Sequence, residues 1–167
     1  MKIIDSHCHL DFDKFDSDFD EVIKRANNSG ISKILTICTK KDKLDKTLSI
    51  CENNEFIFFA YGLHPLNVGK EKINTNEILK ISCHKKMIAI GETGLDYHYS
   101  KDTINLQKKN FIDHIKLSQN TELPLIIHSR DADKDMQRIL CQEYEKKPFF
   151  AVMHCFSSSQ SLATTAI

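Results

Sequence analysis

Short apolar runs alternate along the chain with amphipathic stretches, a pattern typical of a parallel β-sheet wrapped by helices. The apolar runs are nearly continuous rather than alternating, which indicates strands buried on both faces. Each run is followed by a stretch with helical spacing before the next begins. The predicted strands are residues 2–7, 33–39, 56–61, 87–92, 125–128 and 149–154.

The stretches between these runs carry apolar residues at helical spacing. In the first of them Asp16 or Ser17 is available as an N-cap, and Gly30 ends the helix. Residues 157–167 predict the beginning of a sixth helix. The apolar stripes consist of Phe19, Val22, Ile23 and Ala26, then Leu44, Leu48 and Cys51, then Phe111 and Ile115, and finally Met136, Ile139, Leu140 and Tyr144.

Six βα repeats match the repeating unit of a (β/α)8 barrel, in which about 250 residues make eight units. The 167 residues of this chain supply six. The expected fold is therefore α/β, an incomplete TIM-type barrel, with residues 1–167 as a single domain because no linker interrupts them. An open barrel exposes its first and last strands, so we expect self-association through the open edge.

The charge, the apolar runs and the cysteines of the chain exclude several classes of protein. Lysine plus arginine equals aspartate plus glutamate at 23 each, which argues against a protein that coats nucleic acid or a membrane surface. There is no apolar leader and no membrane-length apolar run, so we expect a cytoplasmic protein without a membrane partner. The six cysteines are scattered and predict free thiols, with Cys38, Cys51 and Cys141 on apolar faces.

Histidines and one acid stand at the ends of the predicted strands, where parallel α/β folds carry their active sites. His7 and His9 are two residues apart, so on an extended chain they point the same way and Cys8 points to the opposite face. By the same alternation, Cys155 and His154 are expected to point to opposite faces. Imidazole and carboxylate ligands suit zinc, manganese or iron better than calcium.

A catalytic ion of this kind keeps an open position for water, and two ions about 3.5 to 4 Å apart clamp both the attacking and the leaving oxygen of a displacement. This geometry fits the hydrolysis of a phosphodiester bond. Glu92 is the natural bridge between two ions. The expected cofactor is therefore a pair of divalent ions, Zn, Mn or Mg.

Five ordered blocks resemble the TatD family of metal-dependent deoxyribonucleases. They are Asp-Ser-His-Cys-His-Leu-Asp at 5–11, Gly-Leu-His-Pro at 62–65, Ile-Gly-Glu-Thr-Gly-Leu-Asp-Tyr at 90–97, Leu-Pro-Leu-Ile-Ile-His-Ser-Arg-Asp-Ala at 123–132, and Met-His-Cys-Phe-Ser at 153–157. The resemblance implies a TIM-barrel hydrolase of the amidohydrolase-like group that acts as a 3′ to 5′ exonuclease on the end of a DNA strand. It implies catalytic roles for Glu92 and His64, with His64 near the substrate phosphate. The metal ligands that it implies are His7, His9, Glu92, His128 and His154.

One part of the family pattern is missing. The family carries a metal-binding aspartate after its seventh strand, whereas no residue after His154 is acidic here. Asp131, Asp133 and Asp135 are expected to be acids at a helix N-terminus instead. Two alternatives therefore stay open: a non-catalytic metal-binding fragment, and a metal hydrolase that cleaves an ester or amide such as an aminoacyl ester.

Several other side chains are candidates for the site. Arg130 is expected to bind a substrate phosphate, or else to pair with Asp131 or Asp133. Phe12 and Phe15 are candidates to stack on a terminal base, whereas the phenylalanines of residues 56–59 are expected in the core. The remaining histidines are expected on the surface, and they are His84, His98 and His114.

Overall fold

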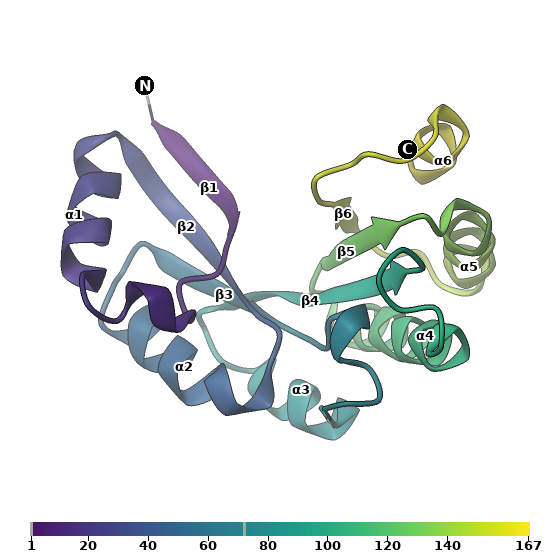
Figure 1. The fold of residues 1–167 in the computed structure, drawn as a ribbon, viewed down its shortest axis with the longest axis horizontal. Coiled ribbons are helices and arrows are strands. Elements are labelled where there is room, and N and C mark those ends of the chain that lie inside the picture. Colours follow the sequence, from purple (N-terminus) through teal and green to yellow (C-terminus); the bar gives the residue numbers. More distant parts are fainter. Residues whose placement is uncertain (1, 72) are drawn as a thin grey trace.

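The structure is a computed structural model that describes residues 2–71 and 73–167. Its strands form one sheet in which neighbours in sequence are neighbours in space, all of them parallel. In Figure 1 the sheet curls through part of a circle and leaves a gap between its first and last strands. The strands are β1 (Ile3–Cys8), β2 (Ile31–Cys38), β3 (Ile57–Tyr61), β4 (Met87–Asp96), β5 (Leu125–Arg130) and β6 (Ala151–Met153).

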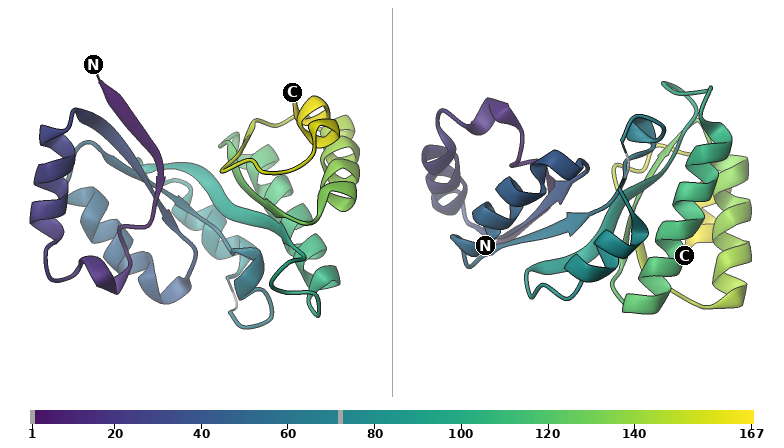
Figure 2. Two further views of the ribbon diagram at one scale, coloured as in Figure 1. Left: turned by 45° about the horizontal axis from the view of Figure 1, so that its top comes forward. Right: turned by 90° about the horizontal axis from the view of Figure 1, so that it is seen from below.

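The helices lie on the convex outer side of this curled sheet, as both views of Figure 2 show. Strand and helix alternate, and each strand pairs with the next strand in the sequence, which is the arrangement of consecutive units in a TIM barrel. The predicted incomplete barrel of six βα units is therefore confirmed. The helices are α1 (Phe19–Asn28), α2 (Leu44–Glu52), α3 (Thr75–Ile81), α4 (Ile104–Thr121), α5 (Asp133–Lys146) and α6 (Gln160–Ala166), and the short 3-10 turns are η1 (Asp13–Phe15), η2 (Lys41–Lys43) and η3 (Pro65–Asn67).

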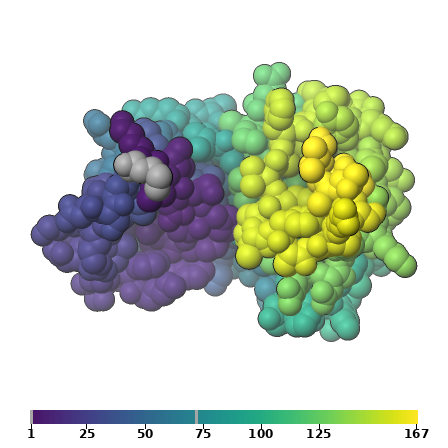
Figure 3. Space-filling model, turned by 90° about the horizontal axis from the view of Figure 1, so that it is seen from above, coloured from purple at the N-terminus to yellow at the C-terminus, as the bar shows by residue number. Residues whose placement is uncertain are grey.

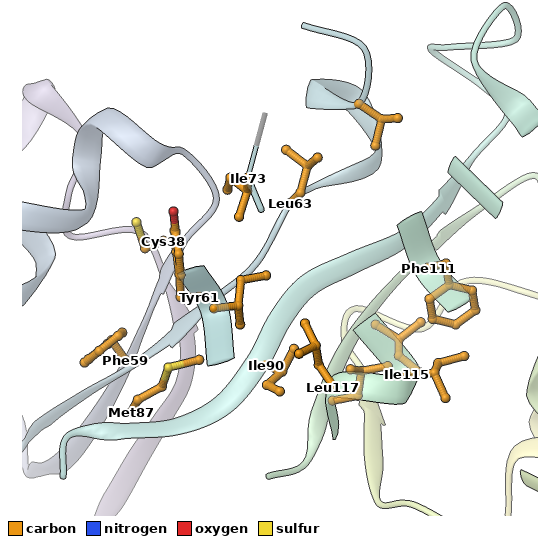
Figure 4. Close-up of a cluster of buried hydrophobic side chains, with 14 of the residues drawn as sticks. Cys38, Phe59, Tyr61, Leu63, Ile73, Met87, Ile90, Phe111, Ile115 and Leu117 are labelled. Atoms are coloured by element: carbon orange, nitrogen blue, oxygen red, sulfur yellow. The ribbon is translucent and has the colours of Figure 1, made fainter. Parts of the chain in front are cut away.

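Successive strand residues point to opposite faces of the sheet and belong to two separate apolar layers. The larger layer joins the outer face of the sheet to the helices, with Phe59 and Tyr61 of β3 and Phe111 of α4 among its fully buried members (Figure 4). The smaller layer contains strand residues alone, such as Ile37 and Ala60, and so lies on the concave face. The sheet is thus buried on both sides at its centre, as the continuous apolar runs predict.

Strand ends differ from the prediction most clearly in β4, which continues four residues beyond Glu92 to Asp96. Glycine makes this extension possible, because Gly94 has a φ of +141° and an added Cβ would lie 2.0 Å from the carbonyl oxygen of His128. Backbones of β4 and β5 therefore approach closely where the strands end. In contrast, β6 is shorter than predicted and contains three of the six predicted residues.

Three predictions about side chains are wrong. Helix α1 has Asp18 at its N-cap position, so neither Asp16 nor Ser17 caps it. Cys141 is exposed, because α5 turns this position away from the sheet. His114 is buried on the inner side of α4, where its Nε2 accepts a hydrogen bond of 3.1 Å from the backbone N–H of Leu63.

The two edges of the sheet are much more exposed than its centre. Ile4 of β1 is 65% exposed and Val152 of β6 is 54% exposed, whereas β4 is buried over nearly its whole length. In Figure 3 the N-terminal and C-terminal parts of the chain, purple and yellow, lie beside each other on one face. Within the described residues no helix is long and apolar enough to cross a membrane.

Candidate metal centre

Glu92 lies at the centre of the site, on the most buried strand. Its side chain is almost fully buried and accepts contacts on both carboxylate oxygens. Oε2 is 3.2 Å from His7 Nε2 and 3.9 Å from His9 Nε2. Oε1 is 2.6 Å from His154 Nε2, 3.1 Å from His128 Nδ1 and 3.3 Å from His64 Nε2. One carboxylate therefore faces five imidazoles supplied by widely separated parts of the chain.

His7 and His154 enter the site from opposite edges of the sheet. His7 belongs to β1 and His154 follows β6, yet their rings stack with centroids 4.0 Å apart. With Glu92 they form a group whose possible ligand atoms all lie within 4.8 Å of one another. The edges of the open sheet thus meet at the candidate metal site.

The hydrogen bonds of His9 prepare it to bind a cation. Its Nδ1 donates to the carbonyl oxygen of Ile37 at 2.9 Å, which leaves Nε2 without a proton in the neutral ring. Burial lowers the pKa of His9, although the nearby Glu92 partly offsets this, so the ring is neutral near pH 7. A bare Nε2 and a carboxylate oxygen then face each other at 3.9 Å, an arrangement that a cation between them satisfies.

His64 has the opposite arrangement. The backbone N–H of Leu66 donates to its Nδ1 at 3.2 Å, so the proton of the neutral ring is on Nε2, which points into the site. A nitrogen that carries a proton donates hydrogen bonds and does not ligate. His64, Glu92 and His128 also form a group within 4.8 Å, but the tautomer makes His64 a donor in it.

His128 is held between two carboxylates. Its Nε2 lies 3.0 Å from Oδ2 of Asp96, and its Nδ1 faces Glu92. Burial by itself lowers the pKa of His128, but hydrogen bonds to both carboxylates outweigh burial and raise it. When Asp96 accepts the Nε2 proton, Nδ1 is free to ligate an ion, which is the usual carboxylate–histidine–metal arrangement.

The same contacts fix the charge of Glu92. Burial alone raises the pKa of its carboxyl, but hydrogen bonds from four surrounding histidines, His128 first, outweigh burial and hold the pKa far below its usual range. Glu92 is therefore ionised at neutral pH. An anionic carboxylate ringed by imidazoles is a donor set that fits zinc or another divalent transition metal.

The histidine cluster opens into a cavity of about 650 Å³ whose lining includes Phe12, Lys14, Lys40 and Asn67. Arg130 is exposed and lines a different cavity, of about 680 Å³, beside the start of α5. The structure therefore brings His64 to the metal cluster and leaves Arg130 outside the cavity that holds it.

The aspartates that follow β5 have other partners. Asp131 pairs with the exposed His98, and neither Asp131 nor Asp133 pairs with Arg130 in the described part of the chain. Asp133 and Asp135 lie in the first turn of α5, as expected of acids at a helix N-terminus.

The two cysteines beside histidines lie outside the cluster. Cys8 packs against the apolar core, and its thiol contacts the carbonyl oxygen of Leu35. Burial raises the pKa of Cys8 to about 12, so the thiol stays protonated. Cys155 is exposed.

Asp96 is the site residue that the sequence analysis missed. It was not considered because the predicted strand ended at Glu92. The signal was present, since Asp96 is four positions after Glu92 and the two side chains point to the same face if the strand continues. A predicted strand that continued past Gly94 to Asp96 would have placed both carboxylates on the same face of the sheet.

Comparison with known proteins places the chain in a family. The family model described as TatD related DNase matches residues 4–167. The chain belongs to this family. The family resemblance drawn from the five sequence blocks is thereby confirmed, and the match covers both the buried centre of the sheet and its edges.

Relatives with curated names support the same membership. The chain is 35% identical over 162 residues to the "Uncharacterized metal-dependent hydrolase YabD" of Bacillus subtilis, which covers 96% of this chain and 63% of the relative. It is 36% identical over 174 residues to the "Uncharacterized metal-dependent hydrolase BU355" of Buchnera aphidicola, with 98% and 65% covered. The chain thus spans less than two thirds of the length of these relatives.

Solved structures agree with the fold. The crystal structure of YjjV, a TatD homolog from Escherichia coli, superposes with a TM-score of 0.88 at 28% identity and covers 98% of this chain and 64% of that one. A hydrolase of the TatD family from Entamoeba histolytica gives a TM-score of 0.84 at 23% identity, which supports the fold alone.

Proposed function

We propose that the protein is a metal-dependent hydrolase that cleaves phosphodiester bonds of DNA from the 3′ end of a strand. The single observation that carries the proposal is the bare Nε2 of His9 facing an ionised Glu92 within a ring of imidazoles. Membership of the TatD related DNase family supports the choice of substrate. We further propose a cytoplasmic location.

The residues that hold the ions are Glu92 between two sites and four histidines around it. Bound divalent ions supply a water of low pKa and positive charge at the reacting oxygens. The ligands that we propose are His7, His9, Glu92, His128 and His154.

His64 and Asp96 act beside the ligands. His64 Nε2 carries a proton, so it donates a hydrogen bond to a non-bridging oxygen of the phosphate and stabilises the charge that develops there. Asp96 orients His128 through its Nε2. Arg130 lines another cavity, and we propose that it contacts a more distant phosphate of the same strand.

A second candidate is metal binding without turnover. Glu92 and Asp96 contact the histidine cluster, and both are engaged by histidines. Neither of these two carboxylates is free to take a proton from water, which favours this alternative, although Asp11 also lines the cavity. Hydrolysis of an ester or amide remains a third candidate on the same donor set.

The experiment that tests the proposal measures nucleotide release from the 3′ end of a short single-stranded DNA with Mn²⁺, Mg²⁺ or Zn²⁺. The wild-type chain is compared with Glu92→Gln, which keeps the side-chain volume and removes the charge. His84→Gln is the matched control, because His84 is a half-buried histidine that lies outside the cluster and pairs with Glu52. We expect turnover in the wild type and the control and its loss in Glu92→Gln.

Metal content separates the candidates. Two equivalents of metal bound by the folded wild type without release of nucleotides would select the non-catalytic alternative. Cleavage of an aminoacyl ester with no cleavage of DNA would select the ester hydrolase. Turnover that survives in Glu92→Gln would show that the reaction takes place away from this cluster.

A further inference from the structure

One wall of the histidine cavity combines an exposed aromatic ring with lysines. Phe12, between β1 and η1, is 41% exposed although the neighbouring Leu10 is buried. Its ring stacks on His9 with centroids 4.9 Å apart and an angle of 19° between the planes. The exposed part of this ring lines the cavity beside the histidine cluster, where a ligand can reach it.

The lysines on this wall are not neutralised equally. Lys43 pairs with Asp13, but neither Lys14 nor Lys40 has a carboxylate partner among the described residues. The Lys14 ammonium lies 5.6 Å from the centroid of the Phe12 ring instead. A cation over an exposed ring is held weakly, so a better partner for the ring displaces it at little cost.

These features fit a nucleotide in particular. A base has a flat π-face that stacks on phenylalanine, and the phosphates on either side of it are anions that ammonium groups bind. A simple ester supplies neither feature, and a peptide supplies both only where an aromatic side chain lies beside acidic ones. The Phe12 ring is also directly against His9, so a base stacked there lies next to the proposed ions.

We propose that Phe12, Lys14 and Lys40 form a nucleotide subsite, in which Phe12 stacks on the base beside the scissile phosphate and the two lysines bind the flanking phosphates. This inference rests on the proposed nuclease function and adds to it a contact with one base of the substrate.

The test measures equilibrium binding by fluorescence polarisation, with Mn²⁺ present and phosphorothioate linkages at the 3′ end to suppress cleavage. Two single-stranded oligonucleotides are compared, one complete and one abasic at its last two 3′ positions. We expect the wild type to bind the complete strand about tenfold more tightly than the abasic one. In Phe12→Leu the two affinities become equal through weaker binding of the complete strand, and Phe12→Tyr restores the difference.

Matched controls come from elsewhere on the surface. Phe150 is 84% exposed and lines another cavity, so Phe150→Leu keeps the full preference for the complete strand. Lys40→Gln lowers the slope of log affinity against log salt by about 0.7, the value for one phosphate contact on a single strand, whereas Lys116→Gln on the exposed face of α4 leaves it unchanged. Circular dichroism melting checks that each variant is folded.

The possible outcomes distinguish a failure of the subsite proposal from a failure of the nuclease proposal. If the wild type cleaves DNA but binds both oligonucleotides equally, or if folded Phe12→Leu keeps the preference, the subsite is wrong and the nuclease proposal stands. If the wild type neither cleaves nor binds either strand, both proposals are wrong.

Discussion

The centre of the sheet and its two edges contribute differently to the site. Strand β4 is buried almost throughout and supplies the carboxylates of Glu92 and Asp96. Strands β1 and β6 are largely exposed, and they bring His7 and His154. The negative charge is thus fixed in the rigid centre, whereas two of the imidazoles depend on strands that have one neighbour each.

This difference means that the site and the open edges depend on each other. The rings of His7 and His154 meet although β1 and β6 lie at opposite ends of the sheet. An ion bound by both histidines and by Glu92 ties the two edges to the centre. Metal affinity therefore depends on the positions of the two edge strands. Substitutions in the central strands are expected to disturb the whole histidine cluster.

The largest effect is expected from Gly94→Ala in the centre. An added Cβ would lie 2.0 Å from the carbonyl oxygen of His128, so β4 and β5 must separate. We expect a loss of about 3 kcal/mol or more in the free energy of unfolding, measured with urea. Gly69→Ala is the control, because Gly69 also has positive φ but its Cβ meets nothing closer than 3.7 Å. Equal losses in the two variants would show that backbone conformation, not the contact, decides the cost.

Metal addition is expected to act chiefly on the edges. An ion at one hundred times its dissociation constant adds about 2.7 kcal/mol of stability, and a chelator removes it. In hydrogen exchange we expect the amides of β1 and β6 to gain more protection than those of β3. His154→Ala should abolish the gain at both edges, whereas His84→Gln should keep it. Uniform protection across the sheet would mean that the ion does not join the edges.

Part of the centre was predicted from the sequence. Continuous apolar runs identify buried parallel strands, and polar residues at their ends identify the site, so β2, β3 and the positions of Glu92 and His128 followed from pattern alone. Asp96 was not predicted, because it lies beyond the predicted end of the strand. The strand continues through Gly94 because that glycine approaches β5 closely, and this contact is not visible in the sequence.

Long-range contacts explain the remaining errors. His114 stands among charged residues in the sequence, yet it is buried because the backbone N–H of Leu63, 51 residues away, donates to it. Nothing in local spacing predicts that partner. Cys141 shows the converse, since its apolar character predicted burial but no described element covers that face of α5.

His114 offers a pH test of the centre. Burial lowers its pKa from 6.5 to about 4, so between these values the unfolded chain binds more protons than the folded chain. Its contribution to stability is complete above pH 6.5 and is lost as pH falls toward 4, by at most about 1.4 kcal/mol per pH unit. His114→Gln keeps an acceptor for Leu63 but cannot titrate. Urea titrations of the metal-free chains should show a shallower decline in this variant, whereas a slope equal to that of the wild type would mean that His114 is accessible to protons when folded.

The smallest effect on the folded monomer is expected at the edges themselves. We propose that the chain self-associates through β1 and β6, because their unpaired backbone groups and exposed Ile4 and Val152 form a surface on which another strand can pair. Ile4→Lys and Val152→Lys place charge on these edges and should shift sedimentation toward the monomer. Because both side chains are already exposed, the free energy of unfolding should change by no more than about 0.5 kcal/mol. Leu106→Lys, at a residue that is 52% exposed on α4, is the control for added charge alone. If it dissociates the protein as well as the edge variants do, general repulsion and not edge pairing governs association.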